Sequence, residues 1–403
     1  MNRYLAYQDG ELLFEDVALS EISEEMYTPF YVYSKAAILE KVEALKQSFA
    51  DIKPMIAFSM KALDTTLILK LIGERGCSVQ VENVFELERA IMSDFKPTSV
   101  IMDSYGLPDT QLEAILKQKP LIINTGNIFE LQPINDVAAS LDMGVRIGLR
   151  INPDIDTGGI FGKNYGARDS RIGIPKEDID QALALIKNLP QLNLVGLSCH
   201  LGSQVVQLAP WVKMTEFIVG LYKDIKGRGF NLEYLDLGGG FPVDYGNGDF
   251  LEIKKIARNI TPHFKDLDCR VILEPGRYFT AEAGVLVTSV LGVKKMHTKT
   301  FVICDAGFSE LPRSALYRID NEVVPVKDST PAQPKTESGP FSSGGATEPV
   351  DLASNPSMED PGEINQIRMP IPTEFLSVHE AGQSEETPSI PGEPIEVDLV
   401  GPG

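Results

Sequence analysis

Short apolar runs alternate with longer amphipathic stretches through most of this 403-residue chain. The runs are predicted to be buried strands of a parallel sheet, because they are apolar on both faces. They cover residues 55–60, 77–81, 98–102, 120–124, 144–151, 194–199, 233–237 and 270–273. Helix-like stretches lie between them, near residues 65–75, 84–93, 108–117, 128–139, 176–188, 211–227 and 249–266. This alternation predicts an α/β protein with a (β/α)₈ barrel of the TIM type, and an open doubly wound sheet is the competing architecture.

The two ends of the chain lie outside this pattern. Residues 4–18 give short strand-like pieces with a turn at Asp9-Gly10, and residues 28–33 are predicted to be extended. Ser34 is a predicted N-cap for a helix over residues 35–49, which carries apolar Ile38, Val42, Leu45 and Phe49 on one face. We expect both ends to build a second, β-rich domain that is incomplete here. The expected divisions are 1–30 (N-terminal strands), 31–280 (barrel), 281–326 with 394–403 (partial C-terminal β domain), and 327–393 (linker).

The net charge of −20 argues against nucleic acid or an anionic membrane surface as a partner. The net negative charge is unevenly spread, and residues 327–393 supply −9 of the −20. Residues 327–393 hold twelve Asp and Glu against three Lys and Arg, together with ten prolines. This composition predicts a disordered acidic, proline-rich linker, because it cannot bury enough apolar surface to offset the entropy of ordering.

The four cysteines show neither metal-ligand nor disulfide spacing. Cys77, Cys199, Cys269 and Cys304 lie in or beside apolar strand-like runs, so we expect buried free thiols. The start of the chain has no signal-peptide core, and no apolar run approaches membrane-spanning length. A cytoplasmic protein is the expectation.

Chemically versatile side chains follow four of the predicted strands. Lys61 ends the first strand and His200 follows the sixth. The run Gly238-Gly239-Gly240 follows the seventh strand, and Glu274 with Arg277 follows the eighth. Barrel active sites gather at the carboxyl ends of the strands, so these groups are expected to meet at one site.

Each of these groups also has a purely structural interpretation. A strand-end lysine can be desolvated, which lowers its pKa as a Schiff-base lysine requires, but it can also be an ordinary surface lysine. Three glycines can expose backbone N–H groups to a phosphate, or they can form a flexible turn. His200 can stack on a planar cofactor or be a core histidine. Glu274 follows a buried run and needs a partner, which is either a cofactor nitrogen or Arg277.

Taken together, the motifs resemble the fold-type III pyridoxal-phosphate-dependent decarboxylases, and most closely their diaminopimelate branch. The similarity runs from about residue 4 to residue 326. The matching stretches are TPFYVYS (28–34), FSMKA (58–62), RINPD (150–154), SRIGI (170–174), HLGSQ (200–204), LDLGGGFP (235–242), EPGR (274–277), DAG (305–307) and LPRSALY (311–317). The resemblance implies decarboxylation of meso-diaminopimelate to L-lysine, the last step of lysine biosynthesis.

The resemblance also implies a role for each matching residue. Lys61 would bind pyridoxal 5'-phosphate covalently, His200 would stack on its ring, and Glu274 would pair with the ring nitrogen. Ser203, Gly238, Gly239, Gly240 and Gly276 would surround the phosphate. Arg277, Arg313 and Tyr317 would bind substrate carboxylates. No metal is implied, and the expected assembly is a homodimer or an association with a complete subunit.

The chain departs from the family pattern at three places. Where the family usually has Tyr-Ala-x-Lys-Ala-Asn, this chain has Phe58-Ser59-Met60-Lys61-Ala62-Leu63. In the second strand the family usually carries Asp, Ser and Gly-Glu, whereas this chain has Gln80, Asn83 and Phe85-Glu86. Residues Val323-Val324-Pro325-Val326 also match the diaminopimelate branch. After this stretch the family continues to a Gly-Pro-x-Cys-Glu-Ser-x-Asp motif that completes the partner's site, and later to a tyrosine. Residues 395–403 resemble the strand before that motif, and the motif itself and the tyrosine have no match here.

Three hypotheses therefore remain open. The chain is an active diaminopimelate decarboxylase-like carboxy-lyase, a related decarboxylase with another amino-acid or carrier-bound substrate, or a non-catalytic cofactor-binding paralogue. The retained site residues favour the first two hypotheses, and the unmatched C-terminal motif favours the third. We expect cofactor binding, weak dimerisation and slow turnover from this chain alone.

Overall fold

The computed structural model describes residues 3–157, 164–245, 250–312, 316, 321–327, 369–371 and 395–400. It divides into two compact units, Tyr33–Gly284 and a second unit made of Met1–Val32 with Val285–Gly403. Each unit has its own sheets and its own core. The candidate chemistry described below lies in the first unit.

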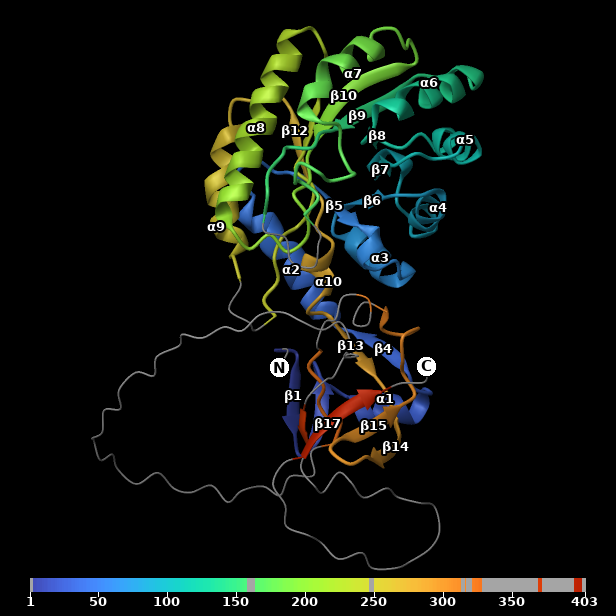
Figure 1. The fold of residues 1–403 in the computed structure, drawn as a ribbon, viewed down its shortest axis with the longest axis vertical. Coiled ribbons are helices and arrows are strands. Elements are labelled where there is room, and N and C mark those ends of the chain that lie inside the picture. Colours follow the sequence, from blue (N-terminus) through green and yellow to red (C-terminus); the bar gives the residue numbers. More distant parts are fainter. Residues whose placement is uncertain are drawn as a thin grey trace, which may run out of the picture. The chain divides into compact units, whose positions relative to one another are not determined.

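The first unit is built on a closed barrel of eight parallel strands, in the order β10-β11-β12-β5-β6-β7-β8-β9 (Figure 1). The strands are β5 (Met55–Ser59), β6 (Ser78–Val81), β7 (Val100–Ser104), β8 (Ile122–Thr125), β9 (Val145–Arg150), β10 (Leu192–Ser198), β11 (Tyr234–Asp236) and β12 (Arg270–Leu273). All eight strands predicted from the apolar runs are confirmed, and the competing open sheet is wrong. Strand β7 begins two residues later than predicted because Pro97–Ser99 forms the 3-10 helix η2.

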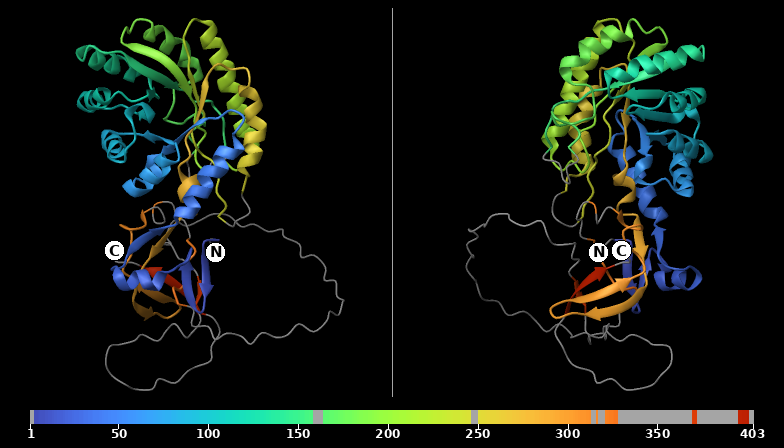
Figure 2. Two further views of the ribbon diagram at one scale, coloured as in Figure 1. Left: turned by 180° about the vertical axis from the view of Figure 1, so that it is seen from behind. Right: turned by 45° about the vertical axis from the view of Figure 1, so that its right-hand side comes forward.

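Helices surround the barrel on the outside, as Figure 2 shows from two further directions. They are α2 (Lys35–Ser48), α3 (Thr66–Glu74), α4 (Val84–Met92), α5 (Asp109–Gln118), α6 (Leu131–Ser140), α7 (Ile179–Ile186), α8 (Leu208–Gly227), α9 (Ile253–Ile260) and α10 (Arg277–Thr280). The short helix α10 was not predicted. The 3-10 helices η1 (Met60–Ala62), η3 (Ile128–Glu130), η5 (Lys176–Asp178) and η6 (Thr261–Phe264) adjoin these elements.

Helix α2 illustrates how the local sequence defines an element. The Ser34 side chain accepts a hydrogen bond from the Ala37 N–H at 2.9 Å, so the predicted N-cap is confirmed. The predicted apolar face is buried along its whole length, at Ile38, Val42, Leu45 and Phe49. A cap and a buried stripe together determine where the helix begins and which side faces the barrel.

Inside the barrel, an apolar cluster contrasts with the polar ends of the strands. The cluster consists of Met55, Ala57, Ile101, Ile122, Val195 and Ile272, which five strands contribute. Met55 and Ile122 are the first residues of their strands, whereas Ser59, Asp103, Asn124 and Arg150 lie at the carboxyl ends. The barrel is therefore a packed core with buried polar side chains at the carboxyl end.

The second unit combines the two ends of the chain. It contains the sheet β1 (Leu5–Gln8), β2 (Glu11–Phe14) and β3 (Val17–Ala18), helix α1 (Leu19–Glu25), and the pair β4 (Phe30–Tyr33) with β13 (Gly284–Val287). A four-stranded sheet follows, in the order β14 (Val290–Lys295), β15 (Thr300–Cys304), β17 (Ile395–Val400), β16 (Met369–Ile371). Helix α1 was not predicted. Its Leu19 packs with Leu12, Phe14, Phe30 and Val287 in the core of this unit.

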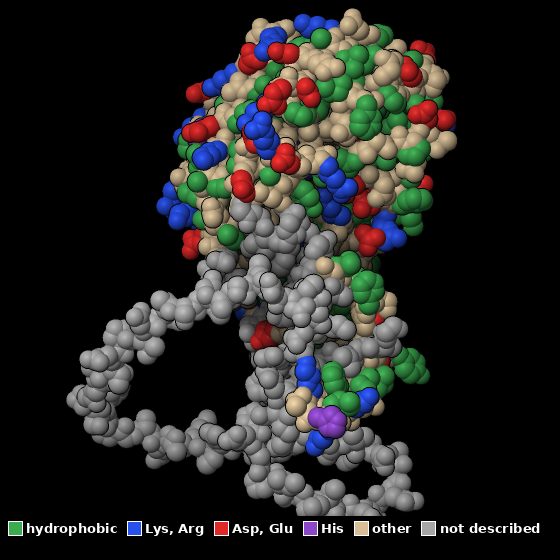
Figure 3. Space-filling model, in the orientation of Figure 1, with side chains coloured by type: hydrophobic (Ala, Val, Ile, Leu, Met, Phe, Trp, Pro, Cys, Tyr) green, Lys and Arg blue, Asp and Glu red, His purple; other side chains and the backbone are tan. Residues whose placement is uncertain are grey.

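Most of the segment predicted to be a linker, residues 327–393, lies outside the described residues. Lys327 is described and pairs with Glu11, and strand β16 also falls within this segment. The cysteines are free; Cys77, Cys199 and Cys304 are buried, whereas Cys269 is partly exposed and corrects the expectation for that residue. Within the described part of the chain, no helix is long and apolar enough to cross a membrane. On the face of the barrel in Figure 3, acidic and basic side chains are interspersed.

Candidate active site

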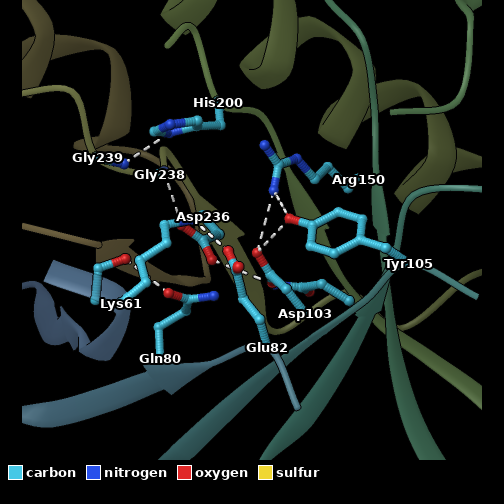
Figure 4. Close-up of polar contacts among 12 residues, drawn as sticks. Lys61, Gln80, Glu82, Asp103, Tyr105, Arg150, His200, Asp236, Gly238 and Gly239 are labelled. Carbon is cyan, nitrogen blue, oxygen red and sulfur yellow. Dashed lines mark hydrogen bonds and ion pairs between the residues drawn. The ribbon is translucent and has the colours of Figure 1, made fainter. Parts of the chain in front are cut away.

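The four side-chain groups predicted at strand ends come from adjacent strands of the barrel. Lys61 lies in η1 directly after β5, and Glu274 follows β12. The glycine run follows β11 and His200 follows β10. Since the strand order is β10-β11-β12-β5, these residues meet at one part of the rim, as Figure 4 shows for Lys61, His200 and Gly239.

His200 is held by the glycine run. The backbone N–H of Gly239 donates to His200 Nδ1 at 2.9 Å, so Nδ1 is the unprotonated nitrogen of the ring. Burial lowers the pKa of His200 well below its ordinary value, and the charges of Arg150 and Lys61 lower it further. His200 is therefore a neutral imidazole, and it stacks on Tyr165 with the ring centroids 5.8 Å apart.

The glycine run is required by close packing, and the alternative of a flexible turn is wrong. A Cβ at Gly238 would lie 2.4 Å from His200 Nδ1, and one at Gly239 would lie 2.2 Å from the Glu274 carbonyl oxygen. A Cβ at Gly240 would lie 2.5 Å from the Gly202 carbonyl oxygen. Gly238 and Gly240 also have φ values of 64° and 95°, which side chains disfavour. Three strand-end loops therefore converge at this run.

Backbone N–H groups in this region differ in their availability. The N–H of Gly238 donates to Asp236 Oδ1 at 2.8 Å, and that of Gly239 is used by His200. Within the described ranges, the N–H groups of Gly240 and Gly276 donate to no acceptor. Both of these donors are available to an anion.

Glu274 is buried, and its Oε1 has no hydrogen-bond partner among the described residues. Burial raises its pKa well above the ordinary value, and the negative charges of Asp236 and Asp103 add to that shift. Burial and these neighbouring charges therefore favour the protonated form of Glu274. A buried polar atom without a partner is costly, which points to a partner that belongs to a ligand.

The alternative that Arg277 satisfies Glu274 is wrong. Arg277 Nη1 donates to the Tyr245 hydroxyl at 3.2 Å, and its guanidinium lies 5.9 Å from the centre of the Tyr245 ring. Arg277 therefore lies against Tyr245, which the sequence analysis did not identify. Nothing in the sequence distinguished this tyrosine from the eleven others.

A buried ion pair lies beneath the site. Arg150 Nη1 contacts Asp103 Oδ2 at 3.1 Å, and both side chains are almost fully buried. Tyr105 donates to Asp103 Oδ2 at 3.1 Å and also contacts Arg150 (Figure 4). Burial acts to lower the Arg150 pKa, but the acidic groups around it outweigh burial and raise it. Arg150 is thus a permanent positive charge in the interior of the site.

Asn124 links this ion pair to Asp236. Its Nδ2 donates to Asp103 Oδ1 at 3.1 Å and to Asp236 Oδ2 at 3.4 Å. Gly148 leaves room for it, because a Cβ there would lie 2.1 Å from Asn124 Oδ1. Burial and the charge of Asp103 raise the pKa of Asp236 to about 7. The signal that could have revealed this network was the polar residues near the ends of the apolar strands β7, β8, β9 and β11.

Lys61 forms an ion pair with Glu82, a residue that the sequence analysis did not select (Figure 4). About half of the Lys61 side chain, 47%, is exposed. Burial acts to lower the pKa of Lys61, but Glu82 and then Asp103 outweigh it, so the pKa is raised. The expectation of a lowered pKa is therefore wrong for the free lysine, because an acidic partner lies against the amine.

The positions that depart from the family pattern have structural roles here. Gln80 is buried, and its Oε1 accepts a hydrogen bond from the Ser59 hydroxyl at 2.6 Å. Asn83 is the N-cap of α4 and accepts from the Glu86 N–H at 2.9 Å. Neither change removes Lys61 from the strand end.

The other predicted residues are distributed as follows. Ser203 lies half-buried in the loop after His200, and Gly276 follows Glu274. A Cβ at Gly276 would lie 3.2 Å from the side chains of Ala62 and Ser59, so this position is tightly packed. Arg313 and Tyr317 lie outside the described residues. No metal-ligating cluster of His, Cys, Asp and Glu occurs within the part of the chain that the structure describes.

Comparison with known proteins gives consistent matches. Residues 35–281 match the family described as pyridoxal-dependent decarboxylase, pyridoxal binding domain. A protein named diaminopimelate decarboxylase from Aquifex aeolicus (strain VF5) is 32% identical over 330 residues, or 81% of this chain and 77% of that protein. A protein of the same name from Vibrio cholerae serotype O1 is 33% identical over 326 residues, covering 80% and 78% of the two chains.

Solved structures agree with the sequence matches. The crystal structure of diaminopimelate decarboxylase from Helicobacter pylori complexed with L-lysine has a TM-score of 0.72 and 30% sequence identity, covering 75% of this chain and 76% of that one. The family match spans the barrel and contains all the strand-end groups described above. The chain therefore belongs to the pyridoxal-dependent decarboxylases, a family of carboxy-lyases, and residues 35–281 are its pyridoxal-binding domain.

Proposed function

We propose that the chain decarboxylates meso-diaminopimelate to L-lysine with pyridoxal phosphate bound through Lys61. Several relatives carry the name diaminopimelate decarboxylase, and one matched structure holds L-lysine, the product of that reaction. The chain itself contributes a strand-end amine, a neutral imidazole and a buried carboxylic acid at one rim of the barrel.

The observation that carries this proposal is the unpartnered Oε1 of Glu274. A pyridine nitrogen is a base that accepts a proton, and Glu274 is a buried acid that holds one. When bound, the cofactor supplies an electron-accepting ring that stores the electrons left by departing CO₂. Glu274 would lie beside the ring nitrogen, and its carboxyl group would hold a proton against that nitrogen.

His200 fits a planar ring for a different reason. Its neutral imidazole carries no charge that would oppose a protonated pyridine, and the Gly239 N–H fixes its orientation. Stacking of this kind orients a ring without forming a bond to it. We assign His200 the role of holding the ring plane, and the stacked Tyr165 supports the imidazole.

The phosphate would lie at the glycine run. Gly240 and Gly276 contribute the two free N–H groups, and the Ser203 side chain lies in the loop that converges with them. Gly238 and Gly239 contribute through the close packing that shapes the loops. Backbone donors without side chains suit a phosphate group.

Arg277 is proposed to bind a substrate carboxylate, because it is half-buried, permanently charged and oriented by Tyr245. Arg313 and Tyr317 are proposed to share this role on the basis of the family pattern alone. We also propose a homodimer or an association with a complete subunit. A cytoplasmic location is supported by the free thiols, since a reducing compartment keeps cysteines unpaired.

The test is a substrate comparison with the purified chain and added pyridoxal phosphate. We expect release of CO₂ and lysine from meso-diaminopimelate, and much slower release of CO₂ from L-lysine or L-ornithine. Faster turnover of either of the latter would assign the chain to a related decarboxylase. Covalent cofactor binding without CO₂ release from any of the three would identify a non-catalytic paralogue. The same samples are examined by light scattering to determine the assembly.

A further inference from the structure

The side chains of Glu82 and Lys61 meet just beyond the ends of two neighbouring strands. Strands β5 and β6 are parallel neighbours, and Ser59 is in register with Gln80. Lys61 lies two residues after Ser59, in the 3-10 helix η1, and Glu82 lies two residues after Gln80, directly after the end of β6. The first pair is joined by the hydrogen bond from Ser59 to Gln80, and the second by the ion pair.

The backbone holds Glu82 in this position. Its N–H donates to Glu86 Oε2 at 2.7 Å, and the next residue, Asn83, caps helix α4. Glu82 therefore lies at a fixed junction between a buried strand and a capped helix. Its side chain is about one-quarter exposed, 26%, so the ion pair is partly shielded from water.

Several charged or titratable groups face Lys61 from the surrounding elements. Glu86 faces it from α4, Asp103 from the end of β7, Arg150 from the end of β9, and His200 from the loop after β10. Burial raises the pKa of Glu86, and the Asp103 carboxylate is engaged by Arg150. Among the described groups, Glu82 alone makes a direct ion pair with Lys61.

We propose that Glu82 is a positioning residue that holds the free amino group of Lys61 at the end of β5 and sets the pH at which that group becomes nucleophilic. The inference rests on the proposed role of Lys61 as the cofactor lysine. Before Lys61 Nζ can bond to the carbon of a carbonyl compound, one N–H bond must break. The proton passes to water or hydroxide, and the nitrogen lone pair is freed. The Glu82 carboxylate raises the pH at which this happens, because it stabilises the charged form of the amine.

The proposal concerns the lysine before it bonds to any cofactor, so it can be tested without turnover. The chain is treated with hydroxylamine to remove bound carbonyl compounds and is dialysed. It is then acetylated with trace acetic anhydride at a series of pH values, and the labelling of each lysine is measured by mass spectrometry. The midpoint of the labelling curve reports the pH at which Lys61 loses its proton.

Three variants are compared with the wild type. Glu82→Gln removes the charge and keeps the size, and we expect the Lys61 midpoint to fall by about one pH unit or more. Glu82→Asp keeps the charge on a shorter side chain, and its midpoint is expected between the two. Glu113→Gln removes an exposed carboxylate that pairs with Lys117 on α5, and it should leave the Lys61 midpoint unchanged.

A Glu82→Gln midpoint equal to that of Glu113→Gln would overturn the proposal. If thermal denaturation shows that Glu82→Gln is unfolded, Glu82→Asp is used in its place. A Lys61 midpoint in Glu82→Asp equal to the wild-type value would then overturn the proposal. The result of the labelling experiment can be distinguished from a failure of the proposed function. A shifted midpoint in a chain that captures no pyridoxal phosphate leaves this inference standing and contradicts only the cofactor assignment.

Discussion

Gly239 donates its backbone N–H to Nδ1 of His200 at 2.9 Å, and this one hydrogen bond determines the protonation of the ring. Nδ1 is an acceptor, so the hydrogen of the neutral imidazole is on Nε2. The same bond joins the loop after β10 to the loop after β11. The glycine run therefore shapes the site through its contacts with His200 and Glu274 as well as through its N–H groups.

Replacement of Lys61 tests the cofactor assignment directly. Lys61→Ala is expected to abolish the visible absorbance of bound pyridoxal phosphate, because no other amine occupies the end of β5. Borohydride reduction followed by peptide mapping should identify the adduct on Lys61 in the wild type and none in the variant. Lys117→Ala, on the exposed side of α5, serves as the control and should retain the adduct. An adduct on another lysine in the wild type would contradict the assignment.

Glu274→Gln tests whether the proton of the buried acid matters. The amide is neutral and similar in size to the protonated acid, so the free energy of unfolding should change by less than about 1 kcal/mol. Turnover should fall by roughly a hundredfold, because an amide cannot transfer a proton to the ring nitrogen. Steady-state rates and urea denaturation of the same preparation separate the two effects. If the loss of turnover is matched by a loss of folded protein in the urea denaturation of the same preparation, the role of Glu274 is structural.

Asp236 should contribute a loss of stability to the cofactor-free chain as the pH rises from about 4 to 7. Asp236 titrates near 7 in the folded chain and at its ordinary, lower pKa when unfolded. Between those values the folded state binds more protons than the unfolded state, which gives a negative slope of about 1.4 kcal/mol per pH unit for one proton. The raised pKa of Glu274 adds a slope of the same sign, and the lowered pKa of His200 adds one of the opposite sign. The slope that belongs to Asp236 is therefore the difference between the wild type and Asp236→Asn in urea denaturation at several pH values. Parallel curves for the two proteins would contradict the shifted pKa.

Arg150→Ala should destabilise the chain by about 3–5 kcal/mol, because it leaves Asp103 charged and buried without its partner. The matched control is Lys117→Ala, which breaks an exposed pair with Glu113 and should cost less than about 1 kcal/mol. Chemical denaturation measures both values. A similar small loss in the two variants would mean that water or another group reaches Asp103.

Two glycine replacements should change stability in opposite directions. Gly239→Ala places a Cβ 2.2 Å from the Glu274 carbonyl oxygen, so it should lower the melting temperature and weaken cofactor binding. Gly220→Ala lies within helix α8, where a Cβ would meet no atom within 4 Å. It should stabilise the chain by roughly 0.5–1 kcal/mol, because alanine is the better helix former. Thermal denaturation of both variants tests the contrast, and loss of stability in Gly220→Ala would refute it.

The sequence by itself determined the barrel and the location of its site. Apolar runs such as Met55–Ser59 are buried along their whole length, and that pattern is local, so each strand could be read from its own residues. Ser34 and the buried face of α2 were predictable for the same reason. The fold then placed Lys61, His200, Glu274 and the glycine run on four adjacent strands, where their positions at strand ends had suggested they would meet.

Only the tertiary structure decided how these groups are charged and paired. Glu82 was missed because its importance arises from the register of β5 with β6, which brings it against Lys61. Asp103, Asn124 and Asp236 come from three separate strands, and their shifts and contacts exist only once the barrel closes. A pKa depends on burial and on every nearby charge, and both are properties of positions in space. The order of residues determined which groups face the site, and the packing of strands determined what each group can do there.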